Sequence, residues 1–190
     1  SSNNLWYESG ILKVSKGGKY GIIDTNGGQI VGCDYDSINA LKGVTNSLLT
    51  QKNGKYGLVD NVGTVIIDNQ YEAIEPVSNQ FENGYIVKNE EGEYGVINYT
   101  KTVAIETNYD DIKNVYGNGK YFIVKEGDNW EVIDVEGKKY LSGEYDDIVS
   151  VNGENAIVIK NDKYGVVGIT DEKNIIDIKY DNITYATGNN

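Results

Sequence analysis

The chain has 190 residues, of which 29 are acidic and 17 are basic, and it carries a net charge of −12 at pH 7. This charge repels phosphate backbones and anionic lipid headgroups, so we expect no nucleic-acid partner. No stretch reaches the roughly 18 apolar residues of a membrane-spanning helix, so we also expect no membrane insertion.

Residue usage favours strands over helices. The chain contains sixteen Tyr and 23 Gly but one Pro, which is typical of many short strands joined by tight turns. The single cysteine, Cys33, excludes an internal disulfide. Because Met is absent, we expect a processed form or part of a longer multidomain chain.

Two anchors recur along the chain. The first is Tyr-Gly followed by two apolar residues, at positions 20, 56, 94 and 164, with Trp130-Glu131 in its place in the fourth copy. The second is Tyr-acidic-x-Ile, starting at positions 35, 71, 109, 145 and 180. The first anchor advances by 36, 38, 36 and 34 residues, and regular periods of this size indicate a repeat architecture. We divide the chain into a preceding-repeat end or linker (1–9) and five repeats: 10–41, 42–77, 78–115, 116–151, and 152–190 with the tail.

The pattern within each repeat predicts an antiparallel meander of three strands and a short fourth strand. A first apolar segment ends in Lys, and pairs such as Asn53-Gly54 predict two-residue hairpin turns. The loops at 89–92 and 126–128 are expected to be longer. The strand that follows is apolar on both faces, so it belongs in the middle of a layered packing. An Asp-x-x-Gly turn then leads to the third segment.

The glycine of the first anchor predicts a close approach by a neighbouring backbone or ring. Glu131 takes that place in the fourth copy. We therefore expect either a displaced neighbouring ring or an exposed rim there.

The motif G-K-Y-G, two apolar residues and Asp, closed by Y-D-x-I, resembles the WG-repeat family of bacterial proteins, whose hallmark is G-K-W-G-hydrophobic-I-D with a closing K-Y-D. The resemblance covers residues 10 to 186, with Tyr replacing the motif Trp in four copies. It implies a surface or secreted bacterial location and no common activity. Varied copy number in that family favours an open array.

We therefore predict an all-β fold of five tandem meander repeats of about 36 residues, stacked as an open, solenoid-like superhelical array. A small five-bladed β-propeller is the alternative.

The repeated acidic residues follow each second-anchor Tyr. Asp110, Asp111, Asp146 and Asp147 are weak candidates for a calcium site, and the competing interpretation is turn chemistry and solvation. No metal or cofactor is predicted.

Aromatic residues at repeated positions are expected to pack between repeats, although they could also stack on sugars. Candidate binding residues are therefore mostly those that break the repeat: Trp6, Tyr7, Tyr99, Tyr116, Trp130 and Tyr185.

We expect no catalytic residues. The chain has no His, and its one Cys has no base partner. The leading hypothesis is a non-catalytic bacterial surface or secreted interaction module whose acidic, Tyr-rich β-surface meets a protein or cell-wall glycan. The alternatives are a structural spacer that holds a neighbouring catalytic or anchoring domain and, third, a carboxylate-based glycoside hydrolase.

Overall fold

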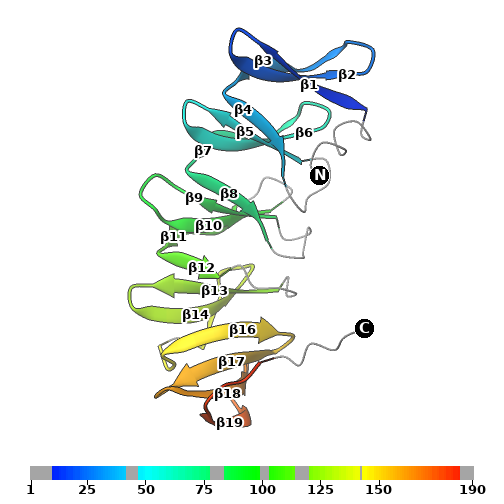
Figure 1. Ribbon diagram of the computed structural model, residues 1–190. Helices are drawn as coiled ribbons and strands as arrows, with labels where there is room; N and C mark the ends of the chain where they lie inside the picture. The colour runs from blue at the N-terminus through cyan, green and yellow to red at the C-terminus, as the bar shows by residue number, and fades with distance from the viewer. Residues whose placement is uncertain are drawn as a thin grey trace.

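The chain folds as an open stack of five antiparallel β-sheets (Figure 1). The computed structural model describes residues 10–41, 47–77, 84–98, 103–113, 120–141 and 143–184, with the side chains of 103 and 104 left aside. The first and last sheets in chain order lie at opposite ends of the stack, so the sheets do not close into a ring (Figure 1). The predicted all-β fold and open array are confirmed, and the propeller alternative is wrong. No helix in these ranges is long and apolar enough to cross a membrane.

The sheets follow one another in chain order, and each has a meander topology. Sheet 1 contains β1 (Ile11–Lys16), β2 (Lys19–Asp24) and β3 (Gln29–Tyr35). Sheet 2 contains β4 (Ser37–Ala40), β5 (Ser47–Lys52), β6 (Lys55–Asp60) and β7 (Val65–Tyr71). Sheet 3 contains β8 (Ala73–Pro76), β9 (Tyr85–Lys88), β10 (Tyr94–Ile97) and β11 (Val103–Tyr109). Sheet 4 contains β12 (Asp111–Lys113), β13 (Tyr121–Glu126), β14 (Asn129–Asp134) and β15 (Lys139–Tyr140). Sheet 5 contains β16 (Asp147–Asn152), β17 (Asn155–Lys160), β18 (Lys163–Gly168) and β19 (Asn174–Tyr180).

The turns have the backbone geometry that their residues predict. In the β5–β6 hairpin, Asn53 and Gly54 have φ angles of 52° and 82°, as a two-residue turn with the twist of the strands requires. In the β6–β7 turn, Asp60 accepts hydrogen bonds from the amides of Val62 and Thr64, and Gly63 has a φ of 92°. The expected longer loop at 126–128 is wrong, because Glu126 pairs with Asn129 and leaves a two-residue turn. The loop at 89–92 is longer, as expected.

The middle strand of each inner sheet, 2 to 4, contributes to two hydrophobic cores. In β6, Leu58 faces forward into the core shared with sheet 3, while Val59 faces backward into the core shared with sheet 1. The corresponding residues of β10 and β14 alternate in the same way: Val96 and Ile97, then Val132 and Ile133. Four cores thus lie between five sheets. Each fully buried aliphatic side chain stabilises the stack by about 1.5–3 kcal/mol.

The glycine of the first anchor is required by a backbone contact. Opposite Gly57, the register of β7 shifts, which marks a β-bulge. A Cβ on Gly57 would lie 2.6 Å from the carbonyl oxygen of Ile67 and 2.9 Å from the amide nitrogen of Asn69. Gly21, Gly95 and Gly165 face the same kind of approach in their repeats. The predicted close approach is therefore a bulged neighbouring strand.

In its described residues, the fourth repeat has no such bulge. Its third strand, β15, has two residues where β7 has seven. Glu131 is 7% exposed, so the expected exposed rim is wrong, and the neighbouring strand is instead shortened. The buried carboxylate lies 3.0 Å from the Lys139 ammonium group, which supplies its counter-charge.

The chain passes from one sheet to the next at each second anchor. Tyr35 ends β3 in sheet 1, Asp36 makes the bend, and Ser37 begins β4 in sheet 2. The Asp36 carboxylate accepts a hydrogen bond of 2.7 Å from the Asn53 amide in the next hairpin turn and pairs with Lys19 of its own sheet. Asp36 therefore links two successive sheets.

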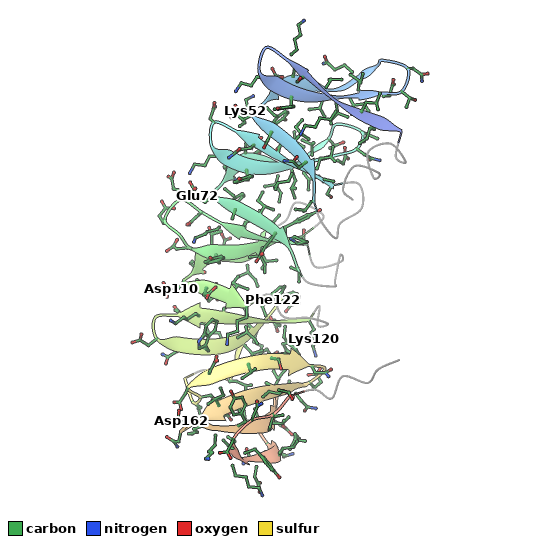
Figure 2. The ribbon with its side chains drawn as sticks, viewed as in Figure 1. Lys52, Glu72, Asp110, Lys120, Phe122 and Asp162 are labelled. Atoms are coloured by element: carbon green, nitrogen blue, oxygen red, sulfur yellow. The ribbon has the colours of Figure 1, made fainter. Side chains whose placement is uncertain are left out.

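The same link recurs along the stack. Asp110 and Asp146 accept hydrogen bonds from the amides of Gly127 and Asn161, at 2.7 and 2.6 Å. In sheet 2, Glu72 instead pairs with Lys55 at 2.6 Å. Glu72 and Asp110 lie along the same side of the stack in Figure 2. These contacts support turn chemistry as the role of the repeated acidic residues.

The bulge contact predicts a selective effect of glycine substitution. Gly57→Ala places a methyl group against backbone, so it should lower the free energy of unfolding by about 1–3 kcal/mol, the usual cost of overpacking. In Gly32→Ala the nearest atom is the movable Asp34 carboxylate, and the expected change is within about 0.5 kcal/mol. Thermal and urea denaturation of both variants measure the effect. Equal destabilisation would contradict the bulge account.

The Asp36 link predicts a pH-dependent contribution to stability. Its hydrogen bond with Lys19, and then that with the Asn53 amide, hold the pKa of Asp36 below its ordinary value. Because the folded pKa is the lower one, the stabilisation is present above about pH 4 and is lost as the pH falls through the folded pKa.

Melting temperatures of the wild type and Asp36→Asn should therefore differ at pH 6 and converge near pH 2. Asp34→Asn is the matched control, since Asp34 makes no ion pair within the described residues. A difference that is unchanged at low pH would contradict the proposed role of the carboxylate.

Candidate functional site

Most repeated aromatic rings are packed between sheets. Tyr56 pairs across the strands with Tyr71, and both lie against the core between sheets 2 and 3. The pairs Tyr20–Tyr35 and Tyr94–Tyr109 occupy the same position in sheets 1 and 3. These rings are therefore buried or half-buried packing elements, as the repeated positions suggest.

Trp130 lies in the corresponding position of sheet 4, half-buried against the core shared with sheet 5. The Lys113 ammonium lies 4.1 Å from the centre of its ring, and that of Lys125 lies at 6.0 Å. Lys113 also pairs with Asp147 and donates a hydrogen bond of 2.8 Å to the carbonyl of Ile148. A cation thus covers Trp130, which a stacking sugar would have to displace.

The other predicted binding residues cannot be placed. Trp6, Tyr7, Tyr99, Tyr116 and Tyr185 lie outside the described residues.

The weak metal candidates are engaged in separate contacts. Asp110 and Asp146 bind turn amides, Asp147 pairs with Lys113, and Asp111 accepts a hydrogen bond from the Ile112 amide. Within the described ranges, no group of three or more metal-binding side chains lies together. The structure brings none of these residues into a shared site.

The third strands carry a different set of carboxylates, which we call the acidic edge: Asp34 in β3, Asp68 in β7 and Glu106 in β11. All three are exposed, and none makes an ion pair with the described residues. They lie close to second-anchor tyrosines. Burial raises the pKa of Tyr35, and the charges of Asp34 and Asp68 raise it further. Asp68 of sheet 2 thus acts on a ring of sheet 1, so the acidic edge extends across sheets.

The same relation holds one sheet further along. Burial raises the pKa of Tyr71, the Gln70 hydrogen bond lowers it, and the charge of Glu106 in sheet 3 raises it. The phenol therefore stays protonated at neutral pH. Each ring can offer a hydroxyl group and an apolar face beside a carboxylate.

A groove opens beside this edge between sheets 2 and 3. It is lined by Val65, Ile66, Ile67, Asp68, Gln70, Tyr71 and Ile97. Its walls combine aliphatic side chains with one carboxylate and one phenol. Such a surface can accept a cationic group at Asp68 while an attached apolar stem lies against the isoleucines.

The two anchors do not predict the acidic edge, because its residues lie outside them. A signal was available. The residue three positions before the second-anchor tyrosine is acidic in three copies, at Asp68, Glu106 and Asp177.

Several solved structures resemble the fold at low identity. One is an Hsv2 from Kluyveromyces lactis with loop 6CD replaced by a Gly-Ser linker, at 12% identity and a TM-score of 0.43, over 87% of this chain and 61% of that one. Another is PorZ of Porphyromonas gingivalis, described as a bacterial surface component of the type-IX secretion system, at 10% identity and a TM-score of 0.40, over 90% of this chain and 25% of that one. The N-terminal domain of Nup159 matches at 11% identity and a TM-score of 0.40, over 88% and 57%. The chain thus spans less than two thirds of each of these structures.

A search of curated protein sequences finds no match. The family model described as the WG containing repeat matches residues 20–43, 56–87 and 94–130. Each of these segments begins at the tyrosine of a first anchor. This match confirms the predicted resemblance and identifies these three segments as WG repeats.

Proposed function

We propose that the chain is a non-catalytic interaction module that presents its acidic edge to a basic segment of a partner protein. The observation that carries the proposal is the groove beside β7, where Asp68 and Tyr71 line a hollow with aliphatic walls. A cell-wall glycan is the second ligand class, because a phenol beside a carboxylate also suits sugar hydroxyl groups.

Charge supports a cationic partner. The repeated acidic residues bind turn amides of the next repeat or lysines of their own repeat. Asp34, Asp68 and Glu106, in contrast, make no ion pair with the described residues. Their charges are therefore available to a partner. The net charge of −12 also speeds encounter with basic surfaces at low ionic strength.

The proposal also covers the location of the module and the chain to which it belongs. We place the module outside the cell or on the surface of a bacterium, within a longer multidomain chain, because three of its segments match the WG repeat. We assign it no catalytic role, since the sequence contains no His and the repeated carboxylates are engaged in turns.

A structural spacer is the competing function, and a specific observation favours it. The first-anchor rings of sheets 1 to 4 pack against inter-sheet cores, so these four positions serve the stack itself. A spacer would hold a neighbouring domain at a distance and would need no ligand.

Binding assays separate these functions. The chain is tested for retention on a Lys-rich peptide, on bacterial cell-wall preparations and on a glycan array. The proposal predicts retention on the peptide that falls as salt is raised, because screening weakens exposed charge pairs. Retention on glycans alone would show that the ligand is a glycan and not a basic segment. If the chain is retained on none of the three at micromolar concentration, the structural spacer remains as the function.

Substitutions that remove carboxylates test whether the acidic edge is the surface that binds the peptide. Asp68→Asn with Glu106→Gln should weaken peptide binding roughly threefold to tenfold, since exposed charge contacts contribute about 0.2–1 kcal/mol each. The matched control is Asp128→Asn with Glu136→Gln, which removes the same charge from two other exposed turns. Equal loss in both variants would show that net charge, and not the acidic edge, governs binding.

A further inference from the structure

The acidic edge places a carboxylate on each of sheets 1 to 3. In sheets 2 and 3, the exposed residues Asp68 and Glu106 directly follow the core residues Ile67 and Ile105. Sheets that pack face to face lie about 10 Å apart. Because the sheets follow one another in chain order along the stack (Figure 1), the acidic edge presents negative charge at a regular interval.

In sheet 1 the carboxylate comes from a different position of the strand. Gly32 follows the core residue Val31, so it takes the place of Asp68 and Glu106. A Cβ on Gly32 would lie 2.8 Å from a carboxylate oxygen of Asp34. The Asp34 carboxylate therefore lies where an acidic residue at position 32 would place its side chain, and the row of charges includes sheet 1.

The row of free carboxylates spans three successive sheets. The corresponding residue of the fourth repeat is Ser142, which carries no charge. In sheet 5 the corresponding residue is Asp177, and its carboxylate pairs with Lys179 at 3.0 Å. A ligand that follows the row can therefore form an ion pair with sheets 1, 2 and 3.

A tyrosine accompanies each carboxylate of the row. Tyr35, Tyr71 and Tyr109 end the third strands of the same three sheets. Tyr35 and Tyr71 are half-buried, so part of each ring stays accessible, whereas Tyr109 is buried. Tyr71 lines the groove together with Asp68 and Ile66. Grooves lined by aromatic rings are the sites at which proline-rich segments dock.

The interval between the sheets selects a conformation of the ligand. The polyproline II helix has three residues per turn and rises about 3.1 Å per residue, so every third residue lies on one face at intervals of about 9 Å. In a β-strand, residues three apart point to opposite faces. An α-helix repeats this distance only at every seventh residue, and with side chains it is about 10–12 Å wide. The slim polyproline II helix thus matches the row with the shortest segment.

We propose that the acidic edge binds a polyproline II segment with a basic residue at every third position, which depends on the basic partner proposed above. Each basic group pairs with one of Asp34, Asp68 and Glu106, and the segment spans about seven residues. Its apolar stems lie beside the tyrosines and the aliphatic wall of the groove. Proline suits the intervening positions, because a fixed φ angle reduces the conformational entropy lost on binding.

Isomeric peptides test the spacing. Each contains three lysines, three prolines and three alanines, with lysine at every second, every third or every fourth position. Fluorescence anisotropy at constant ionic strength should give the every-third peptide an affinity roughly threefold to tenfold higher, because more ion pairs form at once. Equal affinities would overturn the proposed spacing and leave the basic partner in place. No binding of any of the three peptides would remove the basic partner as well.

Two further peptides test the conformation. Glycine in place of each proline keeps the lysine spacing but loses the preformed helix, so binding should weaken about threefold. An α-helical peptide with lysine at every seventh residue should also bind more weakly than the proline peptide. Undiminished binding of the glycine peptide, or tighter binding of the α-helical one, would overturn the polyproline II conformation.

A single substitution tests whether the row is the site. Asp68→Asn removes the middle carboxylate, so it should remove most of the advantage of the every-third peptide over its isomers. The matched control is Asp128→Asn, which removes the same charge from an exposed turn of sheet 4 and should keep that advantage. Thermal denaturation of both variants checks that the fold is retained. An advantage that persists in folded Asp68→Asn would contradict the proposed site.

Discussion

Burial of the middle strand on both faces is the constraint on which the structure depends. A sheet of three or four short strands cannot cover two apolar faces alone, so each sheet needs a neighbour on each side. Leu58 and Val59 show this in adjacent positions, because one side chain enters the core ahead and the other enters the core behind. The stack is stable where neighbours exist on both sides.

The other recurring residues maintain this arrangement. Gly57 lets the bulged β7 approach, and Tyr56 and Tyr71 fill the space between sheets at the edge. Asp36 fixes the bend that carries the chain into the next sheet. Such positions are constrained by the fold and leave little freedom for a ligand. The proposed function therefore uses positions outside the anchors, such as Asp68 and Glu106.

The sequence predicts the fold well because its signals are local and repeated five times. Turn pairs such as Asn53-Gly54, the two-faced strand at 58–59 and the glycine opposite a close neighbour each have one physical explanation, and the structure agrees with all three. The fourth repeat is predicted less well. Glu131 signals a change there, but the shortening of β15 depends on the neighbouring strand, which one residue does not specify.

The site is predicted poorly for a different reason. Whether an exposed carboxylate is engaged depends on distances between repeats, and these follow from the stacking. Asp36 and Asp68 are both acidic residues near a tyrosine, yet the first binds a turn amide of the next sheet and the second lines an open groove. A family resemblance based on structural positions does not distinguish them.

Hydrogen exchange of backbone amides in the native state tests the central claim most directly. If each sheet is stabilised by two neighbours, then β6, β10 and β14 of the inner sheets should exchange more slowly than β2 and β18 of the end sheets. Protection should fall progressively from the middle of the stack towards both ends. Equal protection in all five sheets, or slowest exchange at an end, would contradict the account.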